Sequence, residues 1–575
     1  MSMTRRGALL FGGAGLATGV QGIQGAYASS GNSGIETSYA TSLAGNSPGA
    51  NFIVVTDDPY NAVPYPRGSS AGSSSTAKIQ AAVDLAAANY AAGTGPTRVF
   101  IPEGEYTLAT TTKTTSVMRI GFVASHPSGG NYFSLTSTAC LQLPAGVSLH
   151  GAGVGKTILH RYTTGPSAII ETIDYENASI TDMSLIGGGT TSNTHGIFMS
   201  LSSPAPHAHK NIWLERLEIA NVGLYGIGHQ YGSPDNLYYQ DLWIHDTGDD
   251  GIDHKPRNGT TDYNNNGAKG AFFNNIMVER HGRNFGDASG LDIRGRAQLN
   301  NISVVDFGRP GTRTFGITMS SGISNVQDKR PSTARSTLDN FYIEGNPLYD
   351  CSGLQAQTCG PQNINNGYIR WCTTNGFWVR DSLGSPTQSW RNGPTVSNIT
   401  VEGSRGGSAF RVDQPKSALS NLKAVSDIQT FDATRGNLVA GQTAFTLWNP
   451  MDTTTANRVV QKNDVALVPG QSYTTSGNTL TLTAPVAAGD RVEVINKSIH
   501  GCIVAVTDVN LNGYMPDAWA GGVEAGPTAL GRLTQSGVAI TKQVLTYSRS
   551  GETAASAQMR TVLRNLGLIT DSTVP

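Results

Sequence analysis

The sequence predicts an all-β solenoid, a parallel β-helix, for most of the chain. Glycine is abundant at 69 of 575 residues and only 14% of residues are charged, a balance typical of turn-rich β structure. One strand type recurs at intervals of 25, 34 and 26 residues, marked by Leu217, Leu242, Ile276 and Ile302. A second type, such as "GIDHK" from residue 251 and "GLDIR" from residue 290, follows each first one and leaves no room for crossover helices. Such periods indicate repeats that stack only on their neighbours.

The first 28 residues predict an export signal. Paired arginines at 5 and 6 precede a weakly apolar stretch that reaches Val20, and Ala26-Tyr27-Ala28 supplies an A-x-A cleavage site. The arginine pair resembles a twin-arginine signal, which implies export across a bacterial inner membrane and a periplasmic or secreted protein. The alternative is an ordinary N-terminus that carries two arginines. No later segment is apolar enough to predict stable insertion into a membrane.

Residues 29–75 form a polar leader, and residues 76–107 follow it with a helix and a strand. Ile79, Ala82, Val83, Leu85 and Ala86 recur at helical spacing, and the run from 98 to 101 predicts a strand. This helix, this strand and the "IPEGEY" turn resemble the N-terminal cap of pectin-lyase-like right-handed parallel β-helices. The resemblance implies that residues 76–427 form the capped β-helix.

The chain after the β-helix changes character. Residues 428–498 contain short alternating strands with Gly and Pro turns, which predicts a small inserted β module, similar to accessory modules of phage tail proteins. Residues 499–575 then predict a returning coil and a short C-terminal helix, in which Met559, Val562, Leu563 and Leu566 share one face. This helix either caps the solenoid or joins neighbouring chains, for example in a homotrimer.

Charge, cysteine and asparagine usage narrow the function further. The net charge of −1 provides no general attraction to nucleic acid. Cys351 and Cys359 are close enough in sequence for a small disulfide, whereas no C-x-x-C pair supports a zinc or redox centre. One set of asparagines recurs at the turns and is interpreted as a structural ladder: Asn275, Asn301, Asn340, Asn398 and Asn421.

The stretch "DDGIDHK", residues 249–255, is the densest group of charges in this solenoid. Alternate side chains of a strand face opposite sides, so Asp253 and Lys255 face outward when Ile252 faces the core. The same reasoning places Asp292 and Arg294 outward on a neighbouring strand, about 4.8 Å away. Paired carboxylates raise one pKa, and the stacked cations are expected to lower the pKa of Lys255. These are conditions for acid–base catalysis, although such charges also solvate exposed sheets.

Further residues in the same outward register predict a long groove for a chain-like substrate. Trp378 offers a ring for stacking against a sugar, and Arg380 and Arg411 can pair with carboxylates of an acidic polymer. His229 is expected to face outward beside the acids and to bind substrate, whereas His254 falls on the core-facing register.

Two enzyme families of this fold offer templates. The segment resembles β-helix lyases that act on alginate and dermatan, in which a carboxylate-rich strand ends in a lysine and an arginine follows on the next turn. That resemblance implies that Lys255 abstracts the proton next to a uronate carboxylate and that Arg294 neutralises this carboxylate or protonates the leaving oxygen. It also implies Ca²⁺ as a cofactor, held by Asp249, Asp250 or Asp253.

The second template is that of polygalacturonases and tailspike depolymerases, which are glycoside hydrolases. In that template Asp250, Asp253 and Asp292 act as acid, base and water-positioning residue. We favour the lyase because a basic pair stacks beside the acids. A third hypothesis is a non-catalytic carbohydrate-binding or surface-scaffold protein, because the fold alone does not determine function.

Overall fold

The structure is a computed structural model that describes most of residues 52–496 and several short strands beyond them. The described segments are 52–65, 74–111, 113, 115–120, 132–161, 165, 167–203, 208–229, 233–255, 270–320, 336–346, 349–357, 362–380, 394–402, 410–412, 418–425, 427–433, 437–447, 458–496, 502–504, 510–511, 521–524, 531–535, 543–547 and 569–573. The predicted export signal, the C-terminal helix and Cys359 lie outside these residues. Among the described helices, none has the length and apolar character needed to cross a membrane.

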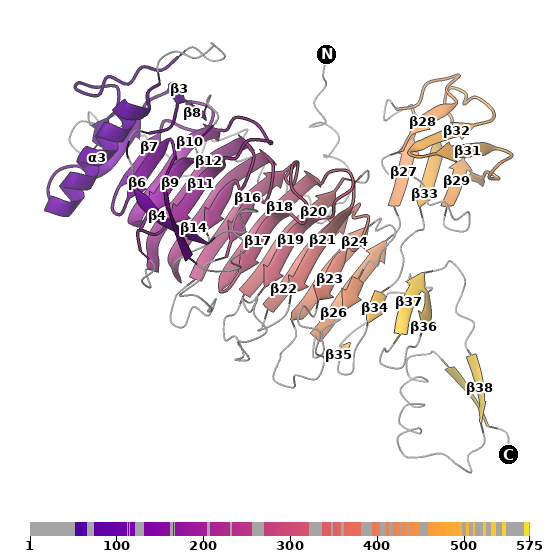
Figure 1. The fold of residues 1–575 in the computed structure, drawn as a ribbon. Helices are drawn as coiled ribbons and strands as arrows, with labels where there is room; N and C mark the ends of the chain where they lie inside the picture. The colour runs from indigo at the N-terminus through magenta and orange to yellow at the C-terminus, as the bar shows by residue number, and fades with distance from the viewer. Residues whose placement is uncertain are drawn as a thin grey trace, which may run out of the picture.

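Two long sheets of stacked strands run along the molecule (Figure 1). The long-strand sheet follows the order β1 (Phe52–Val54), β2 (Arg98–Ile101), β7 (Ser148–Gly151), β10 (Glu176–Ile186), β12 (Ala208–Val222), β14 (Ser233–Thr247), β16 (Gly270–Glu279), β18 (Ala297–Phe307), β20 (Ser336–Gly345), β22 (Gln362–Arg370), β24 (Thr395–Glu402), β26 (Ala418–Val425) and β35 (Asn510–Leu511), with β3 (Gly104–Leu108) and β8 (Thr157–Arg161) beside this path.

The short-strand sheet contains the second strand type. Its order is β6 (Leu141–Pro144), β9 (Ala168–Ile173), β11 (His195–Ser200), β13 (Ile227–His229), β15 (Ile252–His254), β17 (Ser289–Arg294), β19 (Thr314–Ser320), β21 (Cys351–Gln357), β23 (Phe377–Arg380), β25 (Phe410–Val412), β34 (Cys502–Val504), β37 (Gly531–Gln535) and β36 (Gly521–Glu524). Neighbouring strands from β6 to β34 pair in parallel. The chain alternates between the two sheets, so the predicted right-handed parallel β-helix is confirmed.

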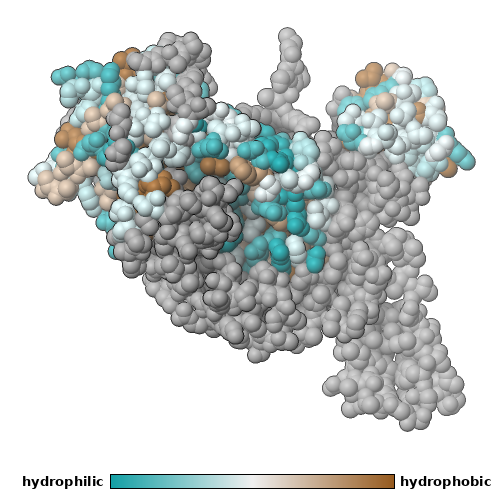
Figure 2. All heavy atoms as spheres, viewed as in Figure 1, coloured by the Kyte–Doolittle hydropathy of each residue, from teal (hydrophilic) through white to brown (hydrophobic). Residues whose placement is uncertain are grey.

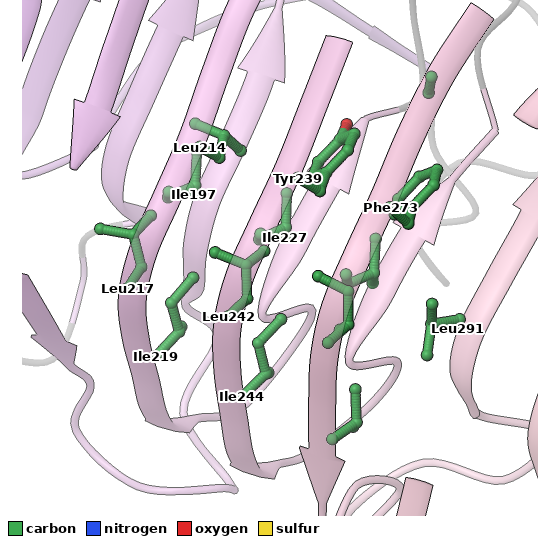
Figure 3. Packing of buried hydrophobic residues seen from close by; sticks show 14 of the residues in the cluster. Ile197, Leu214, Leu217, Ile219, Ile227, Tyr239, Leu242, Ile244, Phe273 and Leu291 are labelled. Atoms are coloured by element: carbon green, nitrogen blue, oxygen red, sulfur yellow. The ribbon is translucent and has the colours of Figure 1, made fainter. Parts of the chain in front are cut away.

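The core lies between the two sheets and is filled by branched side chains stacked in columns (Figure 3). Leu217, Leu242 and Ile276 are in register on β12, β14 and β16, and each is fully buried. Ile227 and Ile252 form a matching column on the short-strand sheet. The recurring anchors of the sequence are therefore core positions, one per turn of the β-helix.

The glycine that begins motifs such as "GIDHK" lies where consecutive turns of the β-helix pack closely, and these glycines form a column. A Cβ atom on Gly251 would lie 2.5 Å from the carbonyl oxygen of Gly290 and 2.6 Å from a methyl group of Val278. A Cβ atom on Gly290 would meet Gly316 and Val304 at 2.6 Å in the same way. Each glycine thus lets one turn stack on the next while the opposing sheet packs against it.

The asparagine ladder occupies bends with left-handed backbone. Asn275, Asn301, Asn340, Asn398 and Asn421 have φ angles between 47° and 57°. Amide groups bond from one turn to the next; Asn421, for example, donates to Asn398 at 2.7 Å. Asparagine tolerates this backbone region better than most residues, so the structural interpretation of these residues is confirmed.

The helix α3 (Thr76–Ala92) covers the N-terminal end of the core (Figure 1). It buries Ile79, Ala82, Val83 and Ala86 and ends at Gly93 in a left-handed cap, whereas Leu85 is 44% exposed. The cap helix is therefore confirmed, with a narrower apolar face than the spacing predicted. A two-stranded antiparallel sheet, β4 (Ser116–Ile120) and β5 (Tyr132–Thr136), also belongs to this part of the chain.

Residues 427–496 form small antiparallel sheets with a core of their own. The strands are β27 (Asp427–Phe431), β28 (Ala444–Thr446), β29 (Arg458–Lys462), β30 (Val465–Ala466), β31 (Tyr473–Ser476), β32 (Thr479–Leu482) and β33 (Val492–Asn496). Phe445, Val460 and Leu480 are buried in this separate core. Val439 and Val465 are more than 60% exposed, and hydrophobic and hydrophilic residues alternate over this surface in Figure 2. Farther along, β38 (Gln543–Tyr547) pairs with β39 (Ile569–Thr573).

The disulfide expected between Cys351 and Cys359 stays a prediction, because Cys359 lies outside the described residues. Cys351 is a buried thiol in the core, and its Sγ lies 3.6 Å from the carbonyl oxygens of Asn346 and Trp371. Its side chain also bonds to the buried thiol of Cys372. Cys351 begins strand β21 and is buried in the core of the β-helix.

Candidate active site

Charged side chains from two adjacent strands converge on one lysine. Asp253 on β15 and Asp292 on β17 are direct partners in the parallel register, which confirms the predicted stacking. The Nζ atom of Lys255 lies 2.5 Å from Oδ1 of Asp253, 2.8 Å from Oδ2 of Asp292 and 3.6 Å from Oδ2 of Asp250. Asp250 reaches this point from the corner before β15, where its Oδ1 accepts a hydrogen bond from the backbone N–H of Ser289 at 2.6 Å.

The cluster is layered, with anions below and cations above. The side chains of Asp253, Asp250 and Asp292 are 0%, 6% and 10% exposed. Those of Lys255 and Arg294 are 20% and 22% exposed. Arg294 bonds to Asp292 through Nε at 3.4 Å and Nη2 at 3.3 Å. A ligand that approaches this surface therefore meets an ammonium and a guanidinium before it meets a carboxylate.

The outward row is more enclosed than the sequence predicted. We expected these side chains to line a solvent-facing strip, but Thr318, Gln355 and Trp378 on the following strands are 4%, 1% and 7% exposed. Strand alternation correctly identifies the face, whereas it carries no information on what covers that face. Because burying charge is costly, these carboxylates and cations must be held by one another.

The expectation for the pKa of Lys255 is wrong in sign. Burial lowers this pKa and Arg294 also lowers it, but Asp253, Asp292 and Asp250 together raise it well above its usual value. Lys255 is thus firmly protonated in this arrangement. From the sequence we expected the neighbouring cation to set this pKa, whereas three carboxylates surround the ammonium group of Lys255.

The aspartates differ strongly from one another in proton affinity. Burial and the neighbouring Asp253 raise the pKa of Asp249 to about 7, and burial raises that of Asp250 well above the usual range. The pKa of Asp292 moves the other way: burial raises it, but Arg294 and Lys255 outweigh burial and leave it lowered. Carboxyl groups with separated pKa values, close together, are typical of acid–base machinery.

The donor set fits a lysine better than the calcium ion implied by the lyase resemblance. Carboxylate oxygens of Asp250, Asp253 and Asp292 lie within 4.8 Å of one another, and this trio differs from the predicted set of Asp249, Asp250 and Asp253. The ammonium of Lys255 already occupies the position at which their oxygens converge. We therefore derive no step through a calcium ion.

Tyr225 belongs to this site and was missed by the sequence analysis. It lies one strand before Asp250 in the same register, and burial followed by Asp253 raises its pKa well above the usual value. Its backbone N–H donates to Nδ1 of His195, and the two rings pack at 4.9 Å. A Cβ atom on Gly228 would lie 2.6 and 2.8 Å from two atoms of the Phe198 ring and 3.1 Å from the Tyr225 ring, so glycine leaves room for both rings. The "YGI" that precedes "GHQ", in the position of the "DGI" of the next turn, was the available signal.

His229 is not a substrate-binding residue of this face, which corrects our prediction. It pairs in register with His254 on the core side, both are fully buried, and their Nδ1 atoms lie 3.1 Å apart. Burial, followed by the effect of His209, lowers the pKa of His254 to about 3, so this imidazole is neutral. Alternation from Ile227 already places His229 inward; its nearness in sequence to the acids was misleading.

Trp378, Arg380 and Arg411 lie together farther along the same sheet, as the register predicted. The guanidinium carbons of Arg380 and Arg411 lie 5.1 and 4.6 Å from the centroid of the Trp378 ring. Because this ring is only 7% exposed, it supports the arginines instead of offering the open stacking face that we expected. The arginines remain candidates for binding an acidic polymer.

Comparison with known proteins gives partial matches. No family model matches this chain. The mannuronan C5-epimerases AlgE6 and AlgE3 of Azotobacter vinelandii are 29% and 30% identical to it over 216 and 182 residues, 36% and 30% of this chain. The matched segments span only 20% and 8% of the lengths of those relatives.

Solved structures also resemble the chain at low identity. The A-module of mannuronan C-5 epimerase AlgE4 from Azotobacter vinelandii covers 65% of this chain and 96% of its own, at 18% identity and a TM-score of 0.41. An exopolygalacturonase from Thermotoga maritima covers 66% and 89%, at 10% identity and a TM-score of 0.33.

Proposed function

We propose that this chain is an enzyme that acts on a uronate-containing polysaccharide and removes the proton from the carbon next to the uronate carboxylate. The layered cluster is the observation that carries the proposal. Lys255 and Arg294 are its most exposed members, over aspartates that are 0–10% exposed. Such a surface attracts a carboxylate ligand, and mannuronan, the polymer named for the curated relatives, is a polyuronate.

The two cations bind and neutralise the substrate carboxylate. Withdrawal of its charge makes the neighbouring C–H more acidic, and charge-assisted hydrogen bonds from Lys255 and Arg294 strengthen as negative charge develops. Asp253 and Asp292 hold these cations in place from below. In this proposal Lys255 is therefore a binding cation, not the base that the lyase template implied.

Asp249 is our candidate for the general base, and Tyr225 for the proton donor. A base is most effective when its pKa lies near the working pH, and the pKa of Asp249 is raised to about 7. Tyr225 has the opposite property, because its raised pKa keeps the hydroxyl protonated and able to donate. Together they supply a base and an acid beside the same carboxylate-binding pair.

Removal of this proton leads to one of two products. If the bond to the leaving oxygen breaks, the polymer is cleaved by β-elimination and carries an unsaturated sugar at the new end. If a proton returns from the other side of the ring, the sugar is epimerised and the polymer stays intact. From the sequence we predicted elimination, whereas the named activity of the curated relatives is epimerisation.

Glycoside hydrolysis is the second candidate, and one observation favours it. The pKa of Asp250 is raised well above the usual range and that of Asp292 is lowered, as expected of a general acid and an ionised partner. One carboxylate oxygen of each lies within 4.8 Å of the other, so the two groups are close enough to act on the same glycosidic bond.

One incubation separates these reactions. The full chain is incubated with polymannuronate in deuterated water, and three signals are followed: deuterium at the carbon next to the carboxylate, new reducing ends, and ultraviolet absorbance of unsaturated sugars. Deuterium without cleavage identifies epimerisation, and absorbance together with reducing ends identifies elimination. New reducing ends without deuterium incorporation and without ultraviolet absorbance would show that the reaction is hydrolysis. No signal on any uronate polymer would contradict the enzyme proposal.

The paired arginines and the A-x-A site further lead us to propose that the enzyme is exported.

A further inference from the structure

A column of aromatic rings lies on the outer face of the long-strand sheet, away from the charged cluster. Trp213, Tyr238 and Phe272 are in register on β12, β14 and β16. Their rings stack nearly parallel, with centroids 5.5 and 5.0 Å apart and interplanar angles of 6° and 12°. Each ring covers one face of the next, so the column ends at the face of Trp213 that is turned toward β10. Trp213 is 40% exposed.

The residues opposite this indole face are small and carry hydroxyl groups. Ser179 on β10 is the direct partner of Trp213, and its backbone N–H donates to Oγ of Ser148 on β7 at 3.0 Å. Ser148 is in turn the direct partner of Arg98 on β2. The strands β7, β10 and β12 lie side by side in Figure 1. Trp213 and Arg98 thus stand about 14 Å apart on the sheet, with the two serines between them, and we call this stretch the notch. Ser148 is buried, and the Oγ atom of Ser179 lies 3.5 Å from Nε2 of His150.

The far end of the notch is a cation. Arg98 is exposed and its guanidinium carbon lies 6.0 Å from the centroid of the Phe52 ring. Among the described residues, no carboxylate forms an ion pair with Arg98. His150 flanks the two serines, and burial followed by the effect of Arg98 lowers its pKa to about 4, so it adds a neutral polar edge. Its Nδ1 lies 3.0 Å from Oγ1 of Thr181.

We propose that this notch is a second, non-catalytic binding site for an acidic sugar residue of the polysaccharide. A pyranose ring presents a flat C–H face that stacks on an aromatic ring, hydroxyl groups that bond to serines, and, in a uronate, a carboxylate that pairs with an arginine. The choice of a uronate rests on the proposed function. The site lies on the opposite sheet from the cluster, so it would hold one stretch of a long polymer while the cluster acts on another.

The surface suits a sugar better than a protein partner. Within the ring column only Trp213 is more than a third exposed, whereas a stable protein interface buries roughly 800 Å² on each partner. The open face of the Trp213 indole matches the size of a single sugar ring, and Arg98, about 14 Å away, would pair with the carboxylate of another residue of the same polymer. The exposed guanidinium gives the notch a charge complementary to a uronate and not to a neutral sugar.

Two variants of the full chain test this site, one that removes an aromatic ring and one that adds a ring. Trp213→Ala removes the stacking face, and Ser179→Phe covers it by extending the ring column by one member. Both should weaken binding of long alginate chains by about fivefold to tenfold, measured by titration calorimetry, without changing the turnover of short alginate oligomers. Tyr90→Ala is the matched control, since Tyr90 is also 40% exposed but lies on α3. Neutral dextran serves as the comparison probe and should bind weakly to all four proteins.

The outcomes separate this inference from the proposed function. The proposed binding site would be contradicted if both variants bound alginate as tightly as wild type, or if Tyr90→Ala lost as much alginate affinity as they do. An absence of alginate binding by the wild-type chain would overturn it as well. If no alginate is turned over but both variants lose affinity, the binding site stands and the proposed reaction fails. If alginate is turned over and both variants bind normally, only the notch is rejected.

Discussion

The two outer faces of this β-helix both carry charged ladders, but they arrange the charges differently. On the long-strand sheet, Arg280 bonds to Asp246 of the preceding turn through two nitrogens, each at 2.8 Å, and Arg216 bonds to Asp182 at 2.6 and 2.9 Å. These side chains are 28–40% exposed. On the short-strand sheet, three aspartates that are 0–10% exposed converge on Lys255.

The difference indicates which ladder needs a functional explanation. A bidentate pair in contact with water links one turn to the next and costs little to form. A buried group of several carboxylates around one ammonium brings a large desolvation penalty, and well-packed apolar residues would satisfy the same fold. The contribution of the exposed arginine–aspartate pairs to stability is enough to explain them. The buried cluster around Lys255 is better explained by the charges that it presents to a ligand.

Lys255→Met should have the largest effect on stability and activity, because Lys255 is the cation at the centre of the buried cluster. The variant leaves three buried carboxylates without their ammonium, so we expect the free energy of unfolding to fall by about 3–5 kcal/mol and activity to disappear. Urea denaturation at neutral pH measures the first effect. Because protonation would then relieve the carboxylates, the loss of stability should shrink as pH falls. A variant as stable as wild type would show that the cluster resembles an exposed surface ladder.

Tyr225→Phe should separate chemistry from stability. The ring contact with His195 is retained, but the hydroxyl that we assign as proton donor is lost, so turnover should fall by about 10²–10⁴-fold. The unfolding free energy should change by less than about 1.5 kcal/mol. Turnover within about twofold of wild type would remove Tyr225 from the proposed mechanism.

The pH dependence of both stability and activity should follow the ionisation of Asp249. Its pKa is about 7 in the folded chain and roughly 3.9 when unfolded, so the folded state holds the proton more tightly. Stability from this group is therefore complete below about pH 4 and is lost as pH rises toward about 7. Activity should show the reverse trend, with kcat/KM rising through an apparent pKa near 7 as the base ionises. Asp249→Asn should flatten the stability trend and abolish activity; an unchanged activity profile would exclude Asp249 as the base.

Arg280→Met should have the smallest effect and serves as the control for Lys255→Met. The guanidinium is 34% exposed and its partners can be solvated, so we expect a loss of about 1 kcal/mol or less and unchanged turnover. Denaturation of the two methionine variants in parallel tests the comparison directly. Equal losses would contradict the distinction drawn between the two faces.

Positions within each turn could be predicted because they obey local rules. The alternation of apolar and polar residues correctly placed Asp253 opposite Asp292 and buried Ile252. The repeated glycines and asparagines of the sequence coincide with the sites of close stacking and left-handed bends. The error at His229 arose from setting this same alternation aside.

Properties that depend on several turns at once could not be predicted. The pKa of Lys255 depends partly on Asp250, which lies at the corner before β15. The alternation of residues along β15 therefore does not predict this contribution. The inward direction of Cys351 likewise depends on how β21 begins. The space around Tyr225 depends on Gly228 of the same turn and on Phe198 of the adjacent strand β11, whose ring lies closest to that glycine.

The sequence by itself determined that this chain is a stacked parallel β-helix and which side of each strand faces the core, because both depend on periodic side-chain placement. It also supplied the charged residues of the candidate site. Only the tertiary structure decided that the anions lie buried beneath the cations, that Lys255 keeps its proton, and that Trp213 ends its column above two serines. Burial and proton affinity depend on every group within a few ångströms in three dimensions, whereas a repeat records only the order of residues along the chain.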